Sequence, residues 1–156
     1  MITKELVELL NKREFVSLAT CDFKGRPNAA PKFLLKADEE HIYLVDYTIS
    51  TTYQNLKLNP RVSISFIDPR TLMGYQLNGA VAIIEKGPIF DRMHKDMIDK
   101  EIRLTAQHLI EDVRGGQKHD VYEVEITEKV VIFEVKVDEI VEIGTKGDLK
   151  RRKKSE

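Results

Sequence analysis

Short segments in which apolar and polar residues alternate, separated by tight turns, make up most of this chain. In residues 61–68, for example, three apolar side chains share one face and the serines between them share the other. Similar strand-like segments occupy residues 15–21, 27–36, 41–47, 75–86, 121–127 and 130–137. Asp22 to Gly25 has the composition of a hairpin turn. Many short strands joined by hairpins predict a small antiparallel barrel.

Three segments have helical spacing instead. Residues 3–13 form an amphipathic pattern that Thr3 can cap, and residues 51–58 end before Pro60. Residues 88–113 repeat apolar side chains at helical spacing until a pair of glycines ends the pattern. Gly79 lies inside the strand at 75–86, which predicts a bulge or a close approach by other backbone.

The size and charge of the chain limit its possible domain organisation. Its 156 residues and 18.0 kDa suffice for one domain with its own core. We expect a single barrel domain over residues 1–145 and a flexible basic tail over residues 146–156. Lys150–Lys154 carry five positive charges against Glu156, which leaves −5 on residues 1–149 of a net charge of −1. An acidic body is not typical of nucleic-acid binders, and RNA contact by the tail is an alternative.

The sequence also indicates a cellular setting. No apolar run approaches the length of a membrane span, and acids within the first ten positions argue against a signal peptide. Cys21 is the one cysteine, so it has no internal disulfide partner. It ends a strand-like run with no histidine near it in sequence, which favours a packing role over a nucleophile. We therefore expect a cytoplasmic protein. The spacing of the histidines does not predict a zinc site.

The start of the helix at 51–58 is a candidate anion site. The hydroxyls of Ser50, Thr51 and Thr52, with the N–H groups of a first helical turn, can hold a phosphate. On the strand at 27–36, a period of two places Asn28, Ala30, Lys32, Leu34 and Lys36 on one face. The small residues leave room for a flat ring, and Lys32 supplies a positive charge. Ordinary helix capping and a solvated lysine explain the same residues without a ligand.

Several weak motifs, in this order and spacing, resemble the FMN-binding split-barrel family, the fold of pyridoxamine 5′-phosphate oxidase and many relatives. They are Gly25-Arg-Pro-Asn-Ala-Ala-Pro-Lys-Phe33, Ser50-Thr-Thr-Tyr-Gln-Asn-Leu56, Asn59-Pro-Arg-Val-Ser63 and Leu77-Asn-Gly79. The similarity covers roughly residues 10–86. It implies a mainly β fold: an antiparallel, Greek-key-like split barrel with peripheral helices.

The resemblance also implies a cofactor and an assembly. In this family FMN lies between the two subunits of a homodimer, with its phosphate near the turn that matches Ser50–Thr52. Many members have Arg or Lys in that turn, so here the charge falls to Lys32, with Lys57 and Arg61 as further candidates. The candidate cofactor-binding residues are Asn28, Ala29, Ala30, Pro31, Lys32, Asp46, Tyr47, Thr48, Ser50, Thr51, Thr52 and Asn55.

The function that the resemblance implies is that of an FMN-dependent oxidoreductase acting on an unidentified small molecule. The carboxy-terminal substrate motif of a true pyridoxamine phosphate oxidase is not evident, so vitamin B6 oxidation is not expected. We expect the acceptor pocket to be lined by Asp68–Gly74 and by the helix at 88–113. Two alternatives use the same residues: a flavin-binding module without turnover, or the same fold with F420 or haem.

Overall fold

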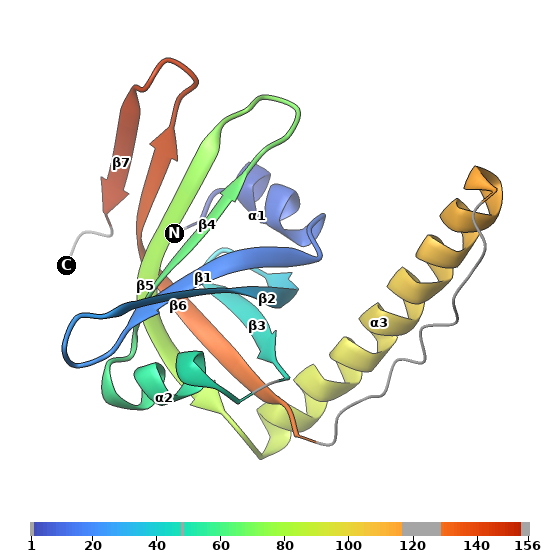
Figure 1. Cartoon of the computed structure of the whole chain (residues 1–156), viewed down its shortest axis with the longest axis horizontal. Coiled ribbons are helices and arrows are strands. Elements are labelled where there is room, and N and C mark those ends of the chain that lie inside the picture. The colour runs from blue at the N-terminus through green and yellow to red at the C-terminus, as the bar shows by residue number, and fades with distance from the viewer. Residues whose placement is uncertain (1, 48, 117–128, 154–156) are drawn as a thin grey trace.

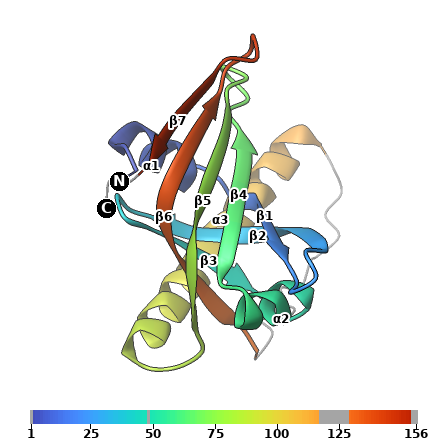
Figure 2. The same cartoon turned by 90° about the vertical axis from the view of Figure 1, so that its left-hand side faces the viewer.

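A single antiparallel sheet of seven strands closes on itself to form the body of the molecule. The computed structural model describes residues 2–47, 49–116 and 129–153. The strands are ordered β3-β2-β1-β4-β5-β6-β7, and β3 also pairs with β6, which closes six strands into a barrel (Figures 1 and 2). Their bounds are β1 Phe15–Cys21, β2 Pro27–Ala37, β3 His41–Asp46, β4 Arg61–Ile67, β5 Gly74–Ile84, β6 Val131–Ile143 and β7 Leu149–Lys153.

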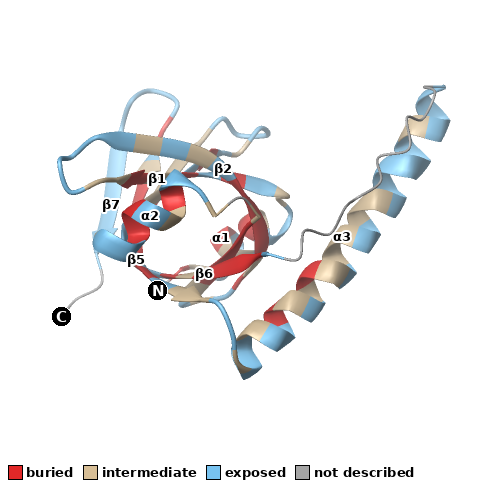
Figure 3. Cartoon of the chain, turned by 60° about the horizontal axis from the view of Figure 1, so that its bottom comes forward, coloured by how far each residue is buried: buried red, intermediate tan, exposed pale blue. Residues whose placement is uncertain are grey.

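Three helices surround this barrel: α1 Lys4–Asn11, α2 Thr51–Leu58 and α3 Pro88–Gly115. The inward side chains of the strands form the main core, which α1 joins through Leu6 and Leu10 and α2 joins through Leu56. Figures 1 and 2 show α1 and α2 at opposite ends of the barrel, and Figure 3 looks into the α2 end. Because the strands alternate as expected, the prediction of a mainly β split barrel with peripheral helices is confirmed.

Helix α3 packs on the outside of the barrel and forms a second, smaller core there. Met93 and Met97 are buried against Phe33, Tyr43 and Ile132 of the underlying strands. After Met97 the helix still contacts the barrel through Lys100 and Glu101, and its carboxy-terminal part extends to one side of the barrel (Figures 1 and 3). The outer face of β2 and β3 is therefore apolar where α3 covers it, and this explains the apolar run at residues 33–35.

Local sequence signals account for several element boundaries. The Thr3 hydroxyl accepts a hydrogen bond of 3.4 Å from the Leu6 N–H and caps α1. In the turn between β1 and β2, Asp22 Oδ1 accepts bonds of 2.9 Å from the N–H groups of Lys24 and Arg26. Gly25 has a φ of 76°, a conformation that favours glycine. The predicted hairpin turn is confirmed.

A bulge between Leu34 and Lys36 corrects one part of the face assignment on β2. Leu34 points into the barrel, whereas the Lys36 ammonium lies 3.0 Å from Asp96 on α3. The prediction that Lys36 shares a face with Asn28 is wrong, because a bulge adds a residue and reverses the alternation after it. Pro31, which has no N–H to donate to a neighbouring strand, lies on a sheet edge, because β3 pairs with β2 only from Phe33 onward.

The carboxy-terminal region differs most from expectation. The predicted strand at 121–127 lies outside the described residues. The strand predicted at 130–137 extends to Ile143 and pairs with β3, β5 and β7. Residues 149–153, which the sequence placed in a flexible tail, form β7 along the edge of β6.

The basic residues of β7 face acidic residues of β6. Arg151 Nη1 lies 3.2 Å from Glu139 Oε1, Lys153 Nζ lies 3.6 Å from the same oxygen, and Arg152 forms an ion pair with Glu142. A strand edge that carries Lys and Arg also resists pairing with other chains. These cations are already partly neutralised, which weakens the case for an RNA contact through this segment.

Candidate functional site

Polar side chains from β1, β2 and α2 meet at the α2 end of the barrel. The Asn28 amide donates to the hydroxyls of Thr52 at 3.1 Å and Thr20 at 3.4 Å, and the Asn55 amide donates to Thr20 at 3.1 Å. Thr20, Thr52 and Asn55 are buried. The structure therefore places Asn28 beside the start of α2. Thr20 was missed, although the β1–β2 register places it opposite Asn28.

The first turn of α2 adds backbone donors to this cluster. Ser50 is the N-cap residue, but its side chain makes no capping hydrogen bond, and Thr51 is exposed. The first N–H groups of a helix have no partner within the helix, so they suit an anion. Ile49 precedes the turn with a φ of 42°, a strained conformation for a β-branched residue. Strain of this kind is common where a loop is held for binding.

Lys32 and Asp46 form a buried ion pair near this end of the barrel. Lys32 Nζ lies 2.7 Å from Asp46 Oδ1, and the two side chains are 5% and 1% exposed. The charge that the sequence analysis assigned to a phosphate is thus neutralised within the protein. The other two candidate cations also interact within the protein. Arg61 forms a bidentate ion pair with Asp138, with distances of 2.5 and 3.2 Å, and the Lys57 ammonium lies 5.2 Å from the centre of the Tyr53 ring.

The opposite face of the β1–β2 ribbon carries a shallow groove of about 360 Å³. Ala29, Ala30 and Pro31 line it on one side, and Phe66 and Ile67 of β4 line it on the other. Apart from Arg13 at one end, its walls are small or apolar, which suits a flat ring. A second groove, of about 560 Å³, continues over Phe66 and Ile67 toward β5 and β6. The candidate residues on β2 therefore divide between two faces of one strand.

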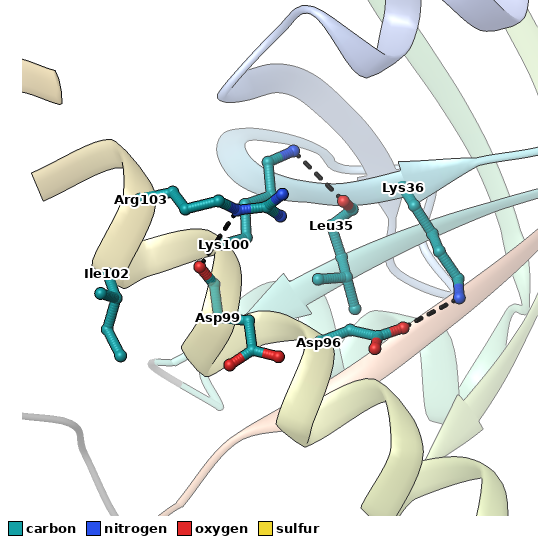
Figure 4. Close-up of a pocket in the computed structure, with 7 residues that line it drawn as sticks. All are labelled: Leu35, Lys36, Asp96, Asp99, Lys100, Ile102 and Arg103. Atoms are coloured by element: carbon teal, nitrogen blue, oxygen red, sulfur yellow. Dashed lines mark hydrogen bonds and ion pairs between the residues drawn. The ribbon is translucent and has the colours of Figure 1, made fainter. Parts of the chain in front are cut away.

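A third groove, of about 550 Å³, lies between β2 and α3 (Figure 4). Its charged residues mostly bind one another or the backbone: Lys36 pairs with Asp96, and Arg103 Nε donates to the Asp99 carbonyl at 3.2 Å. Lys100 Nζ donates to the carbonyls of Leu34 and Leu35 at the β2 bulge. Burial lowers the pKa of Lys100. The contacts of Lys36 and Lys100 in this groove hold α3 against the barrel.

Tyr47 ties the end of β3 to the same helix. Its hydroxyl donates to Glu101, and its ring meets the Phe33 ring edge to face, with centroids 6.4 Å apart. Burial, together with the bond to Glu101, raises the pKa of Tyr47 well above its usual value. Thr48, the next candidate cofactor residue, lies outside the described residues. No cluster of His, Cys, Asp and Glu able to hold a metal occurs among the described residues.

The closed six-strand antiparallel barrel with its peripheral helices defines a class, the split-barrel proteins. A model of the pyridoxamine 5′-phosphate oxidase family matches residues 2–140, and the chain belongs to that family. Within the part of the chain that the structure describes, no helix is long and apolar enough to cross a membrane.

Three known proteins illustrate the range of the similarity. Heme oxygenase HutZ of Vibrio cholerae is 34% identical over 67 residues, which is 43% of this chain but only 38% of HutZ. A protein related to general stress protein 26 from Clostridium acetobutylicum, of the pyridoxinephosphate oxidase family, superposes with a TM-score of 0.65 at 18% identity, covering 96% of this chain and 92% of its own. A pyridoxamine 5′-phosphate oxidase-related, FMN-binding protein from Nostoc punctiforme gives 0.55 at 12% identity, covering 92% and 88%.

Proposed function

We propose that this protein binds FMN and acts as a flavin-dependent oxidoreductase on a small molecule. The observation that carries the proposal is the meeting of Asn28 and Thr52 at the first turn of α2, beside the apolar groove over Ala29–Pro31. One feature suits a phosphate and the other suits a planar ring. Consecutive residues of β2, from Asn28 to Pro31, connect the two features across its two faces, which supports a single ligand that has both.

The residues present fit FMN through neutral donors. The Thr51 hydroxyl and the first N–H groups of α2 would hold the phosphate, since Lys32 and Arg61 are engaged in ion pairs. Ala29, Ala30 and Pro31 would back the ring. Bound flavin supplies hydride and electron transfer by itself, so the protein has to orient it, bond to its edges and shield it from water. Among the described residues that line the groove, none forms an evident acid–base pair, in keeping with that division of labour.

We also propose a homodimer with the ligand at the subunit interface. Phe15, Ile67 and Leu72 beside the two outer grooves are 56%, 59% and 67% exposed, and large exposed apolar side chains grouped in this way favour an interface. A second subunit over them would enclose a ring that one barrel leaves open. Light scattering coupled to gel filtration tests this: the proposal expects twice 18.0 kDa, and a monomer at micromolar concentration refutes it. A cytoplasmic location stays a prediction.

Haem is the second candidate, and a specific observation favours it. A dianionic phosphate is usually met by a cation, whereas Lys32 is committed to Asp46 and the α2 turn has Thr51 and Thr52. The partial match to a protein named as a haem oxygenase points the same way. An apolar groove on the barrel surface also suits a flat tetrapyrrole.

The absorption spectrum of the purified protein separates these ligands, because flavin, F420 and haem absorb at different wavelengths. The apoprotein is then titrated with FMN, riboflavin, F420 and haemin. Tight binding of FMN, weaker binding of riboflavin and reduction of the complex by NADH or NADPH support the proposal. Preference for haemin or F420 over FMN refutes the choice of cofactor, and full FMN occupancy without turnover leaves a flavin-binding module.

A variant tests the phosphate contact directly. Thr51→Ala should weaken the binding of FMN by about 1.5–3 kcal/mol, or roughly tenfold to a hundredfold in affinity, because it removes a hydrogen bond to a charged group. Thr105→Ala on α3 is the matched control and should leave FMN affinity unchanged. Equal FMN affinity in both variants would remove the Thr51 hydroxyl from the site.

A further inference from the structure

Arg13 has hydrogen-bonding capacity that the fold does not use. It lies between α1 and β1, with its guanidinium carbon 4.5 Å from the centre of the Phe66 ring. One terminal nitrogen donates to the carbonyl of Ile67. Its Nε is shielded from solvent and has no hydrogen-bond partner among the described residues. A guanidinium has five N–H donors, and the terminal nitrogen that is not bonded to Ile67 can donate to a ligand.

The charge of Arg13 is not matched by an ion pair in the described parts of the chain. Asp68 is the acidic side chain whose charge interacts with Arg13. Both of its carboxylate oxygens accept hydrogen bonds within their own loop, from the Arg70 N–H at 3.0 Å and from the Thr71 hydroxyl at 2.8 Å. Burial, which shields the Nε from solvent, lowers the pKa of Arg13. A partly desolvated cation, near a carboxylate that bonds within its own loop, favours a negatively charged or polarised ligand group.

Arg13 lies at the end of the apolar groove that is remote from α2. Along the β1–β2 ribbon, Thr20 is opposite Asn28 at the α2 end, and Phe15 is opposite Phe33 at the Arg13 end. The five residue-to-residue steps from Asn28 to Phe33 span about 17 Å at the rise of a β-strand. That length accommodates a phosphate, a ribityl chain and a tricyclic ring laid along the ribbon.

We propose that Arg13 binds the carbonyl edge of the pyrimidine ring of a flavin whose phosphate lies at the start of α2. This inference rests on the proposed function and adds the direction in which the ligand lies in the groove. A guanidinium presents a planar fork of donors, which matches a carbonyl beside a ring nitrogen. It also stabilises the negative charge that this edge carries in the reduced flavin, so Arg13 should raise the reduction potential of bound FMN.

The test compares two ligands and three variants. The affinities of the wild type, Arg13→Met, Arg13→Lys and Lys12→Met for FMN and for riboflavin are measured by quenching of flavin fluorescence. Arg13→Met should lower the affinity for both ligands by the same factor, tenfold or more, because the contact is to the ring that they share. Lys12→Met removes an exposed charge from the neighbouring position and should change neither affinity.

The reduction potential of the bound flavin supplies a readout that a purely structural role would not move. With dithionite as reductant and a reference dye, Arg13→Met should have a lower potential than the wild type. Arg13→Lys should lie between them, and it serves as the test variant if Arg13→Met does not fold. Unchanged affinity and potential, or a loss confined to FMN, would overturn the proposal. If the wild type binds neither flavin, the proposed function itself is refuted, and this inference with it.

Discussion

The buried Lys32–Asp46 pair should contribute strongly to stability only while both partners are present. With side chains 5% and 1% exposed and a separation of 2.7 Å, the pair is desolvated, so removal of one member leaves the other charge without its compensation. Lys32→Met should therefore lower the free energy of unfolding by about 3–5 kcal/mol. For a domain of this size that corresponds to a fall in Tm of roughly 6–20 °C.

Replacement of both members should lower the free energy of unfolding far less. In Lys32→Met/Asp46→Leu no charge is buried, and apolar side chains of similar volume are often neutral or stabilising in place of a buried pair. Urea denaturation followed by circular dichroism, with the wild type, both single variants and the double variant, gives the coupling energy of the pair. A cost below about 1 kcal/mol for Lys32→Met would show that water reaches the site and that the reasoning from burial fails.

Three further predictions concern the barrel. Gly79→Ala should destabilise the protein by more than about 2 kcal/mol in the same assay, because its Cβ would come closer than 3.0 Å to the Lys136 carbonyl oxygen; full stability would contradict the bulge. Thr20→Val should lower the free energy of unfolding by about 1–3 kcal/mol, since the buried Asn55 amide loses its acceptor and Asn28 keeps only Thr52; a neutral result would mean that water replaces the hydroxyl. The hydrogen bond from Asn78 lowers the pKa of Glu139, so its stabilisation is present at neutral pH and is lost as pH falls through that lowered pKa. Asn78→Ala should raise that pKa toward its ordinary value in an NMR titration, and an unchanged titration would exclude the contact.

Local sequence signals predicted the elements near the candidate site well. The β1–β2 turn depends on Asp22 and Gly25, which act on their own neighbours, and α2 covers the predicted residues 51–58. The bulge expected at Gly79 is confirmed between Asn78 and Gly79. Alternation along 61–67 was sufficient to tell inward from outward side chains. These features follow from interactions over a few residues, which a sequence displays directly.

Features that depend on distant strands were not predictable in this way. The flexible basic tail became β7 because Glu139 and Glu142 of β6 lie opposite its cations, a complementarity visible only once the register is known. The bulge after Leu34 reversed the face of Lys36. Arg13 could not be identified as a candidate ligand-binding residue from the sequence, because arginines are common near helix ends. Only the fold places Phe66 and Ile67 beside it.

The amino-acid sequence by itself determined the strands, the turns and the helix start that bring Asn28 to Thr52, since short-range preferences and alternation specify them. Tertiary structure alone decided which charges remain available to a ligand. Whether Lys32 meets solvent, a phosphate or Asp46 depends on how β2 and β3 close the barrel, because desolvation and ion pairing are properties of the packed neighbourhood. The same closure leaves Arg13, and not Lys32, as the cation beside the apolar groove.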